Sequence, residues 1–277
     1  MFEVTPTPAG LEKVRFIAAD MDHTLLREDQ SLPEGLEERI DALASLGVTF
    51  SIASGRPLYT LNDFLGHLSD KIMFIGDNGG AISRFGEPLY QADMPQETYR
   101  ELARGCHEIG AIGLVCALEC CYTEPAAKPY DKFFREFYTN LEYVDDLEQV
   151  SAKADKFTVF FPENDAHART EELLGRVEAD LSYACGDVMW LDIMPAGVSK
   201  GSAMHRVSEI LGIGLDEMCA FGDAANDAEM ISEVGFGYVM ANALDIMAPY
   251  AKHVAPTNDD CGVLKVMDQI IAAKRAM

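Results

Sequence analysis

The chain has 277 residues, of which 48% are hydrophobic and 25% are charged, and its mean hydropathy is −0.01. It carries 46 Asp and Glu residues against 22 Lys and Arg residues, which gives a formal net charge of −24. This acidity argues against a nucleic-acid surface, which needs clustered basic residues, and against binding to anionic lipid. It still permits a small phosphorylated substrate, provided that the site supplies its own positive charge.

The sequence shows no signal for a membrane or for export. No uninterrupted apolar run is long enough to cross a bilayer, and the first residues lack the basic and apolar regions of a signal peptide. We therefore expect a cytoplasmic protein. The seven Cys residues include no C-x-x-C pair and have no His pair beside them, so we expect reduced thiols and no zinc site.

The first part of the chain alternates between strand and helix patterns. Apolar runs predict strands over residues 14–19, 48–53 and 72–75. Leucine and isoleucine at helical spacing predict a helix that starts with a capping box at Ser31, and a second helix over 58–68. This order is typical of parallel strands joined by right-handed crossovers.

The pattern changes after about Arg84, where regular strand–helix units stop. The next part has helix patterns over 97–109 and 166–181, and strand patterns over 111–122, 156–161 and 188–191. Helices and antiparallel-looking strands in this order favour a separate α+β module.

The strand–helix order resumes at Lys200, with strands predicted over 218–221 and 236–240 and a last helix over 263–274. The sequence thus predicts one doubly wound parallel α/β domain that is split by an insertion. We expect the core to comprise residues 1–84 and 191–277, and the inserted α+β domain to comprise residues 85–190.

Polar residues follow the predicted core strands at the points where they end. These residues are Asp20 and Asp22, Ser54, and Asp223 with Asp227. The carboxyl ends of parallel strands share one edge, so we expect these groups to converge. Two carboxylates about 4 Å apart repel by roughly 4 kcal/mol at an effective dielectric of 20, so such a cluster needs protons or a cation. Oxygen ligands without Cys or His favour magnesium over zinc.

The neighbouring residues predict phosphoryl chemistry. Lys200 and the Ser54 hydroxyl add a positive charge and a donor, and the backbone N–H groups from Gly55 onward can bind an anion at a helix start. An Asp carboxylate is a competent nucleophile that forms an aspartyl-phosphate. A second carboxyl two residues away can protonate the leaving oxygen and then activate water.

These motifs resemble those of the haloacid dehalogenase superfamily. D-x-D-x-T, S-G-R, an isolated Lys and G-D-x-x-N-D occur in the order of its four motifs. D-N-G-G at 77–80, G-V-S-K-G at 197–201, M-A-N-A at 240–243 and the place of the insertion resemble its Cof-type phosphatase branch. The resemblance implies a Rossmann-like core with an inserted cap domain, and a magnesium-dependent phosphatase. It implies a small phosphorylated substrate, such as a sugar phosphate or a flavin- or pyridoxal-type phosphate.

The resemblance also implies a role for each motif residue. Asp20 would be the nucleophile and Asp22 the general acid/base. Ser54, with Gly55, would bind the phosphoryl group, and Lys200 would hold the nucleophile and the transferring oxygens. The implied magnesium ligands are Asp20, the backbone carbonyl of Asp22, Asp223 and Asp227.

Several residues near the motifs have open roles. Arg56 is either a substrate contact or part of a structural salt bridge, whereas Asn78 and Asn226 are substrate or loop contacts. His23 departs from the family pattern, because Gly is commonest at that place, and we interpret it as a turn residue. Ala224 likewise stands where this branch often has Gly.

Three other functions remain open from the sequence. A phosphomutase would share the two acids of the first motif. A phospho-acceptor signalling domain would also use acids, a hydroxyl and a Lys around magnesium, although the insertion and Asp22 argue against it. A catalytically idle binding protein is disfavoured because no catalytic residue is missing. The substrate contacts of the cap are expected in 111–129 and 183–189, where no motif identifies the substrate.

Overall fold

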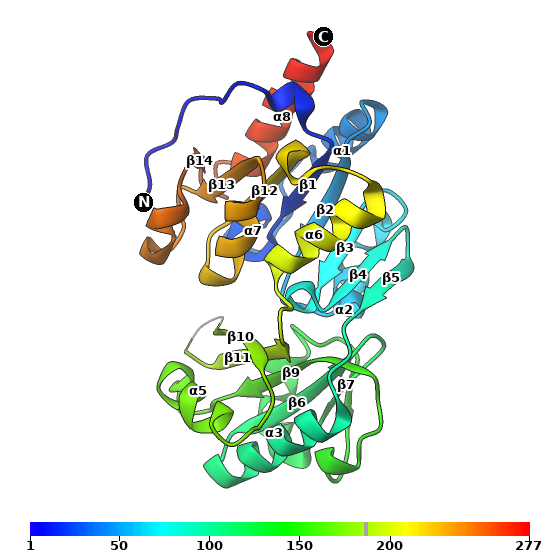
Figure 1. Cartoon of the computed structure of the whole chain (residues 1–277), viewed down its shortest axis with the longest axis vertical. Coiled ribbons are helices and arrows are strands. Elements are labelled where there is room, and N and C mark those ends of the chain that lie inside the picture. The colour runs from blue at the N-terminus through cyan, green and yellow to red at the C-terminus, as the bar shows by residue number, and fades with distance from the viewer. Residues whose placement is uncertain (186–187) are drawn as a thin grey trace.

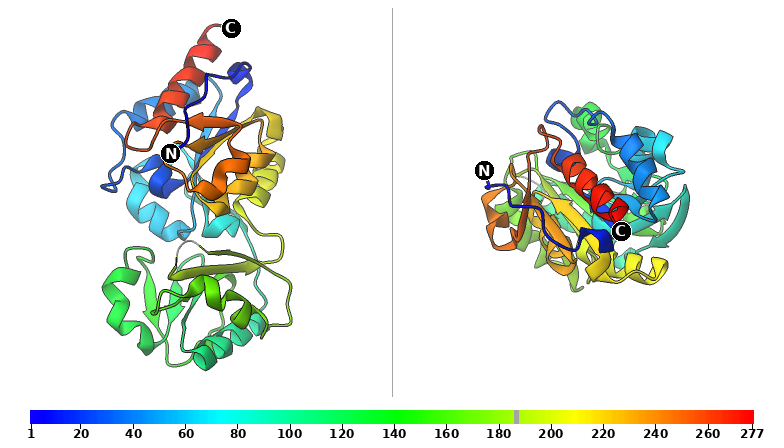
Figure 2. Two further views of the ribbon diagram at one scale, coloured as in Figure 1. Left: turned by 90° about the vertical axis from the view of Figure 1, so that its left-hand side faces the viewer. Right: turned by 90° about the horizontal axis from the view of Figure 1, so that it is seen from above.

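Two β-sheets organise the chain in the computed structural model, which describes residues 1–185 and 188–277. The sheets lie in two lobes that are stacked along the long axis of the molecule (Figure 1; Figure 2). Both termini lie on the first lobe. The chain leaves for the second lobe once and returns once (Figure 1). The second lobe is therefore an insertion into the first.

The sheet of the first lobe, the core, is mostly parallel. Its strands within the described residues are, in spatial order, β14 (His253–Ala255), β13 (Phe236–Met240), β12 (Met218–Gly222), β1 (Phe16–Ala19), β2 (Thr49–Ala53), β3 (Met73–Gly76), β4 (Ala81–Arg84) and β5 (Glu87–Gln91). All neighbours from β14 to β3 are parallel, and β4 and β5 extend one edge in antiparallel fashion. The strand β1 therefore lies in the interior of the sheet.

Helices cover both faces of the core sheet. One face carries α1 (Leu36–Ser45), α2 (Leu58–Leu65) and α8 (Gly262–Arg275), and the other carries α6 (Lys200–Leu211) and α7 (Ala228–Glu233). Residues of β1 alternate between the two layers, because Ile17 packs with α1 and α8 while Phe16 packs with α6 and α7. Strands that are buried on both faces read as continuous apolar runs, which is the pattern that the sequence shows.

The sheet of the second lobe, the cap, is mostly antiparallel. Its strands are, in spatial order, β10 (Leu181–Cys185), β11 (Trp190–Pro195), β9 (Ala154–Phe160), β6 (Ile112–Ala117), β7 (Cys121–Thr123) and β8 (Leu141–Tyr143). The helices α3 (Gln96–Ile109) and α5 (Ala166–Leu174) pack on one face, and the short α4 (Asp131–Phe134) belongs to an aromatic cluster on the other. The predicted doubly wound core with an inserted α+β cap is confirmed.

The strand β9 separates the two faces of the cap sheet by simple alternation. Phe157 and Val159 pack under α3 and α5, whereas Lys156 and Thr158 lie on the opposite face, where Lys156 contacts Gly55 of the core and Thr158 contacts Asp192 of β11. Side chains of a strand alternate between its two faces, so a polar residue at every second position indicates one face that is not a normal core.

The helix α1 starts later than predicted. It begins at Leu36 after Gly35, whose φ of 79° is in the left-handed region that glycine adopts readily. Ser31 forms no capping box and instead donates its hydroxyl to Asp29, as short polar side chains do in tight turns. The capping-box prediction was wrong.

Two predicted elements of the cap also change. The helix predicted over 166–181 ends at Leu174, and Leu181 already belongs to β10. The single strand predicted over 111–122 is a hairpin of β6 and β7. In both cases a continuous apolar pattern spans a turn, and periodicity alone does not locate turns.

The two sheets divide the chain later than the boundaries predicted at residues 84 and 191. The strand β5 still pairs in the core sheet, whereas β11 pairs in the cap sheet as far as Pro195. The antiparallel β4–β5 hairpin was not predicted, because its outer strand is mostly exposed and lacks an apolar run.

Within the described residues, no helix is both long and apolar enough to cross a lipid bilayer.

Candidate active site

The predicted site residues meet at the carboxyl edge of the core sheet, on the side of the cap. Asp20 follows β1, Ser54 follows β2, and Asp223 follows β12. Lys200 is the first residue of α6, and the loop after β3 approaches it closely, since a Cβ on Gly79 would lie 2.1 Å from the carbonyl oxygen of Ser199. Strands that are distant in the sequence therefore deliver their polar ends to one place.

Lys200 is the cation at the centre of this edge. Its Nζ lies 2.6 Å from Oδ1 of Asp20 and 2.7 Å from Oδ1 of Asp227, and the residue is only 1% exposed. Burial alone would lower the pKa of Lys200, but the two carboxylates outweigh it and raise that pKa above its ordinary value. Lys200 is therefore held in its charged form.

Asp227 is engaged through both of its oxygens. Besides the contact with Lys200, its Oδ2 accepts the backbone N–H groups of Asp223 and Ala224 at 3.0 and 3.2 Å. The loop comes so close here that a Cβ on Gly222 would lie 2.3 Å from the Cβ of Asp227. Asp227 thus fixes both the loop after β12 and the ammonium of Lys200.

The three carboxylates carry more negative charge than Lys200 balances. Asp20, Asp223 and Asp227 each offer an oxygen within 4.8 Å of the others, and all three residues are buried. Burial, assisted by Asp227, raises the pKa of Asp223 to about 6, and burial also raises the pKa of Asp20 well above its usual range. Three acids against one ammonium, with oxygen ligands only, fit a divalent hard cation such as magnesium.

The second acid of the first motif lies against an arginine. Arg56 donates to both oxygens of Asp22, at 3.1 Å through Nε and at 2.8 Å through Nη2. The same guanidinium donates to the backbone carbonyl of Glu136 and lies 5.0 Å from the ring centre of Phe137, both in the cap. The structure therefore places Arg56 in a salt bridge that joins Asp22 to the cap.

The turn after β2 brings the predicted phosphate-binding residues together. The hydroxyl oxygen of Ser54 accepts the backbone N–H of Arg56 at 3.1 Å, and Ser54 is only 2% exposed. The carbonyl oxygen of Gly55 accepts a hydrogen bond of 2.6 Å from Nζ of Lys156, a residue of the cap. The turn is thus held by the Ser54 hydroxyl within it and by Lys156 of the cap.

Asn78 and Asn226 lie in a chain of hydrogen bonds rather than at the carboxylate cluster. Asn226 donates to Oδ1 of Asn78 at 3.0 Å, and Asn78 donates to Oδ2 of Asp192 in the cap at 2.7 Å. These contacts link the loop after β12, the loop after β3 and the cap strand β11.

His23 adopts the backbone conformation that glycine favours. Its φ is 58°, and its carbonyl oxygen accepts a hydrogen bond of 2.8 Å from Asn242. Its ring lies 3.2 Å from Glu28, and the side chain is 57% exposed. A left-handed turn explains why Gly suits this place and why His can replace it.

A cavity of about 300 Å³ opens between the cap and the core beside Lys200 and Asn226. Its cap wall is the edge strand β10 from Leu181 to Ala184, and Met194 of β11. Part of the predicted contact region 183–189 thus lines this cavity, while residues 186–187 of that region lie outside the described residues.

The structure adds Lys156 and Asp192 to the site, and no motif of the sequence contains either residue. Lys156 opens the strand predicted over 156–161, and Asp192 directly follows the strand predicted over 188–191; both strands were predicted from their apolar residues alone. The signal in the sequence was alternation, because Lys156 and Thr158 are polar at alternate positions of the predicted strand 156–161, whose other residues are apolar.

Comparisons with known proteins agree with the motifs. A sequence model of haloacid dehalogenase-like hydrolases matches residues 17–267. The chain is 26% identical over 272 residues to the 5-amino-6-(5-phospho-D-ribitylamino)uracil phosphatase YbjI of Escherichia coli K12, across 93% of this chain and 96% of that protein. It is 31% identical over 236 residues to an HMP-PP phosphatase of Yersinia pestis strain Pestoides F, across 83% and 85% of the two chains.

A solved structure agrees as well. SMU.1108c from Streptococcus mutans UA159 superposes with a TM-score of 0.86 at 25% sequence identity, across 94% of this chain and 99% of that one. The match of the family over most of the chain confirms the resemblance that the motifs indicate. The chain therefore belongs to the haloacid dehalogenase-like hydrolases and is a phosphoric monoester hydrolase of that family.

Proposed function

We propose that this enzyme is a magnesium-dependent phosphatase that hydrolyses a small phosphorylated metabolite through an aspartyl-phosphate on Asp20. The observation that carries the proposal is the buried cluster in which Asp20 and Asp227 share the ammonium of Lys200 beside Asp223. Lys200 holds Oδ1 of Asp20, which leaves Oδ2 of the same carboxylate to attack phosphorus.

Asp20, Asp223 and the backbone carbonyl of Asp22 are the groups that we assign to magnesium. A bound magnesium ion would neutralise the carboxylates and stabilise negative charge on the phosphoryl oxygens. The resemblance also implies Asp227 as a magnesium ligand, but we instead assign it to holding Lys200 and the loop after β12, because both of its oxygens already accept hydrogen bonds.

Proton transfer falls to Asp22 in this proposal. Asp22 gives a proton to the leaving oxygen and then takes one from the water that attacks the phosphorylated Asp20. Arg56 orients the carboxylate of Asp22 through its two parallel contacts. The Ser54 hydroxyl accepts from the N–H of Arg56, so its own proton is available for a phosphoryl oxygen.

The cap contributes the wall that meets the rest of the substrate. We propose that the leaving group extends into the cavity of about 300 Å³ under β10, which lies next to Lys200. This size is at the lower end of small-molecule sites and suits a compact metabolite such as a sugar phosphate. The names of the relatives, which refer to phosphorylated small molecules, support a substrate of this class.

Hydrolysis of p-nitrophenyl phosphate tests this function. Wild-type enzyme is expected to release phosphate only with magnesium. The Asp20→Asn variant is expected to lose at least about 10³-fold in kcat, since an amide is no nucleophile. Normal magnesium-dependent turnover by Asp20→Asn would refute the proposal. A screen of phosphorylated metabolites for phosphate release would then identify the substrate.

A further inference from the structure

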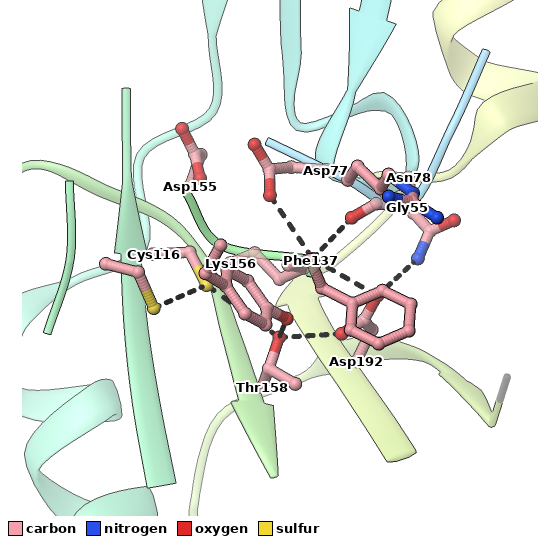
Figure 3. Close-up of polar contacts among 12 residues, drawn as sticks. Gly55, Asp77, Asn78, Cys116, Phe137, Asp155, Lys156, Thr158 and Asp192 are labelled. Carbon is pink, nitrogen blue, oxygen red and sulfur yellow. Dashed lines mark hydrogen bonds and ion pairs between the residues drawn. The ribbon is translucent and has the colours of Figure 1, made fainter. Parts of the chain in front are cut away.

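A buried lysine of the cap contacts the turn that we assign to phosphate binding. Lys156 is 0% exposed, and its Nζ lies 2.6 Å from the carbonyl oxygen of Gly55, 3.2 Å from Oδ2 of Asp192 and 3.2 Å from Oδ1 of Asp77. Figure 3 shows Lys156 where the dashed contacts to these three residues meet. The contacts with Gly55 and Asp192 are hydrogen bonds, whereas the contact with Asp77 is an ion pair without hydrogen-bond geometry.

A buried ammonium needs an explanation beyond stability. Burial alone would lower the pKa of Lys156, but Asp192 and Asp77 raise it well above its ordinary value, so the group stays charged. Replacing a buried ion pair by well-packed apolar residues is often neutral or stabilising. The charge of Lys156 is therefore better explained by its hydrogen bond to the carbonyl oxygen of Gly55 in the core.

The carbonyl of Gly55 belongs to the peptide unit that also carries the N–H of Arg56. The carbonyl of Gly55 and the N–H of Arg56 are the two ends of one planar trans peptide, so they point in opposite directions. The carbonyl accepts from Lys156, and the N–H donates to the hydroxyl oxygen of Ser54 at 3.1 Å. Fixing one end of the plane fixes the other, and a charged donor on the carbonyl also strengthens the N–H as a donor.

We propose that Lys156 is a positioning residue, which orients the peptide between Gly55 and Arg56 and thereby presents the Ser54 hydroxyl to the phosphoryl group. This inference rests on the proposed function, in which Ser54 binds that group. Lys156 acts through Ser54 and does not touch the substrate itself.

Asp192 extends the same arrangement to a second loop. Its Oδ2 holds Lys156 and also accepts from Asn78, which in turn accepts from Asn226 near the carboxylate cluster. Thr158 donates to its other oxygen at 2.6 Å, so the carboxylate is fixed in place. Because Lys156 and Asp192 belong to the cap, both loops are held only while the cap rests on the core.

A double-mutant cycle tests this role through binding of inorganic phosphate. Calorimetry would give the phosphate Kd in the presence of magnesium for the wild type, Lys156→Met, Ser54→Ala and the double variant. Loss of a hydrogen bond to a charged group predicts that each single variant binds phosphate about 10-fold more weakly. If Lys156 acts through Ser54, the double variant binds no more than about 2-fold more weakly than Ser54→Ala alone.

Controls separate this role from a loss of folding. Lys153→Met replaces an exposed lysine three residues earlier and is expected to leave the phosphate Kd unchanged. Because Lys156→Met leaves the buried Asp77 and the partly buried Asp192 without their cation, the cycle is also run in a background with Asp77→Asn and Asp192→Asn, where neither carboxylate charge is orphaned. Thermal unfolding of every variant confirms that the binding data come from folded protein.

The outcomes distinguish this inference from the proposed function. Additive losses in the cycle, or a wild-type Kd in Lys156→Met, overturn the role of Lys156 even if wild-type enzyme hydrolyses p-nitrophenyl phosphate. A wild-type enzyme that binds phosphate but fails to hydrolyse the ester contradicts the phosphatase. In that case, non-additive losses in the cycle still support the positioning of Ser54 by Lys156.

Discussion

At the scale of single residues, Arg56 has the most specific geometry around the acid/base. Its guanidinium forms two parallel contacts with Asp22 and two further contacts with the cap. A lysine supplies the same charge but not the planar fork, so the exchange is not conservative at such a place. Arg56 therefore links the orientation of Asp22 to the presence of the cap.

The Arg56→Lys variant is expected to lose about 10-fold in kcat for p-nitrophenyl phosphate, because Asp22 is held less firmly. The Kd for inorganic phosphate should change little, since the backbone N–H of Arg56 is retained. Arg39→Lys is the matched control, because Arg39 forms a similar fork with Asp268 on the outer helices. An unchanged kcat in Arg56→Lys would show that Asp22 does not depend on this contact.

Asp77 makes the stability of the protein depend on pH. Burial raises the pKa of Asp77 to about 6, although Lys156 opposes this shift. The folded state therefore prefers the protonated acid, while the unfolded chain ionises near pH 4. Stability contributed by Asp77 is present below about pH 4 and is lost as the pH rises through about 6.

Removing this titration is expected to change the pH profile of unfolding. The unfolding free energy of Asp77→Asn minus that of the wild type should rise by about 3 kcal/mol from about pH 4 to about pH 7. Urea unfolding of both proteins at the two pH values measures the difference. Parallel pH profiles for the two proteins would show that Asp77 does not titrate with a raised pKa.

At the scale of elements, the core could be predicted from the sequence because its strands are buried on both faces and follow one another in a regular order. The first-motif acids, Ser54, Lys200 and the acids after β12 were located through the same regularity, since each follows a strand or opens a helix. Their closeness follows from the parallel sheet. The motifs and the order of the parallel strands thus predict the same site residues.

The edge strands of both sheets and the contacts between cap and core were harder to predict for a physical reason. Edge strands such as β5 and β10 bury few side chains, so their sequences lack the apolar runs that indicate a strand. The partners of Lys156 and Arg56 come from segments more than thirty residues away in the sequence. No local pattern contains such contacts, so the link between cap and core required the structure.

The edge strand β10 permits a test of the leaving-group cavity. Ala184 lines the cavity, and Ala184→Phe is expected to fill part of it. The ratio of kcat/KM for p-nitrophenyl phosphate to that for the smaller acetyl phosphate should fall by about 10-fold or more. Ala168→Phe, on the exposed side of α5, should leave the ratio unchanged. Equal losses for both substrates in Ala184→Phe would place the leaving group elsewhere.

At the scale of the whole molecule, the net charge of −24 produces self-repulsion in the folded state. Salt is expected to raise the Tm by screening this repulsion. Magnesium should raise the Tm further than NaCl of equal ionic strength, because an ion that binds only the folded state stabilises it. The extra increase should disappear in Asp223→Asn, and its persistence there would place the magnesium outside the carboxylate cluster.

The covalent intermediate is the most direct test of the proposed chemistry. Asp22→Asn is expected to form phosphorylated enzyme from p-nitrophenyl phosphate, whose leaving group needs little protonation, but to hydrolyse it slowly. Peptide mass spectrometry after a rapid quench should then find one phosphoryl group on Asp20 when magnesium is present. A phosphoryl group on another residue, or none while wild-type enzyme still releases phosphate, would contradict Asp20 as the nucleophile.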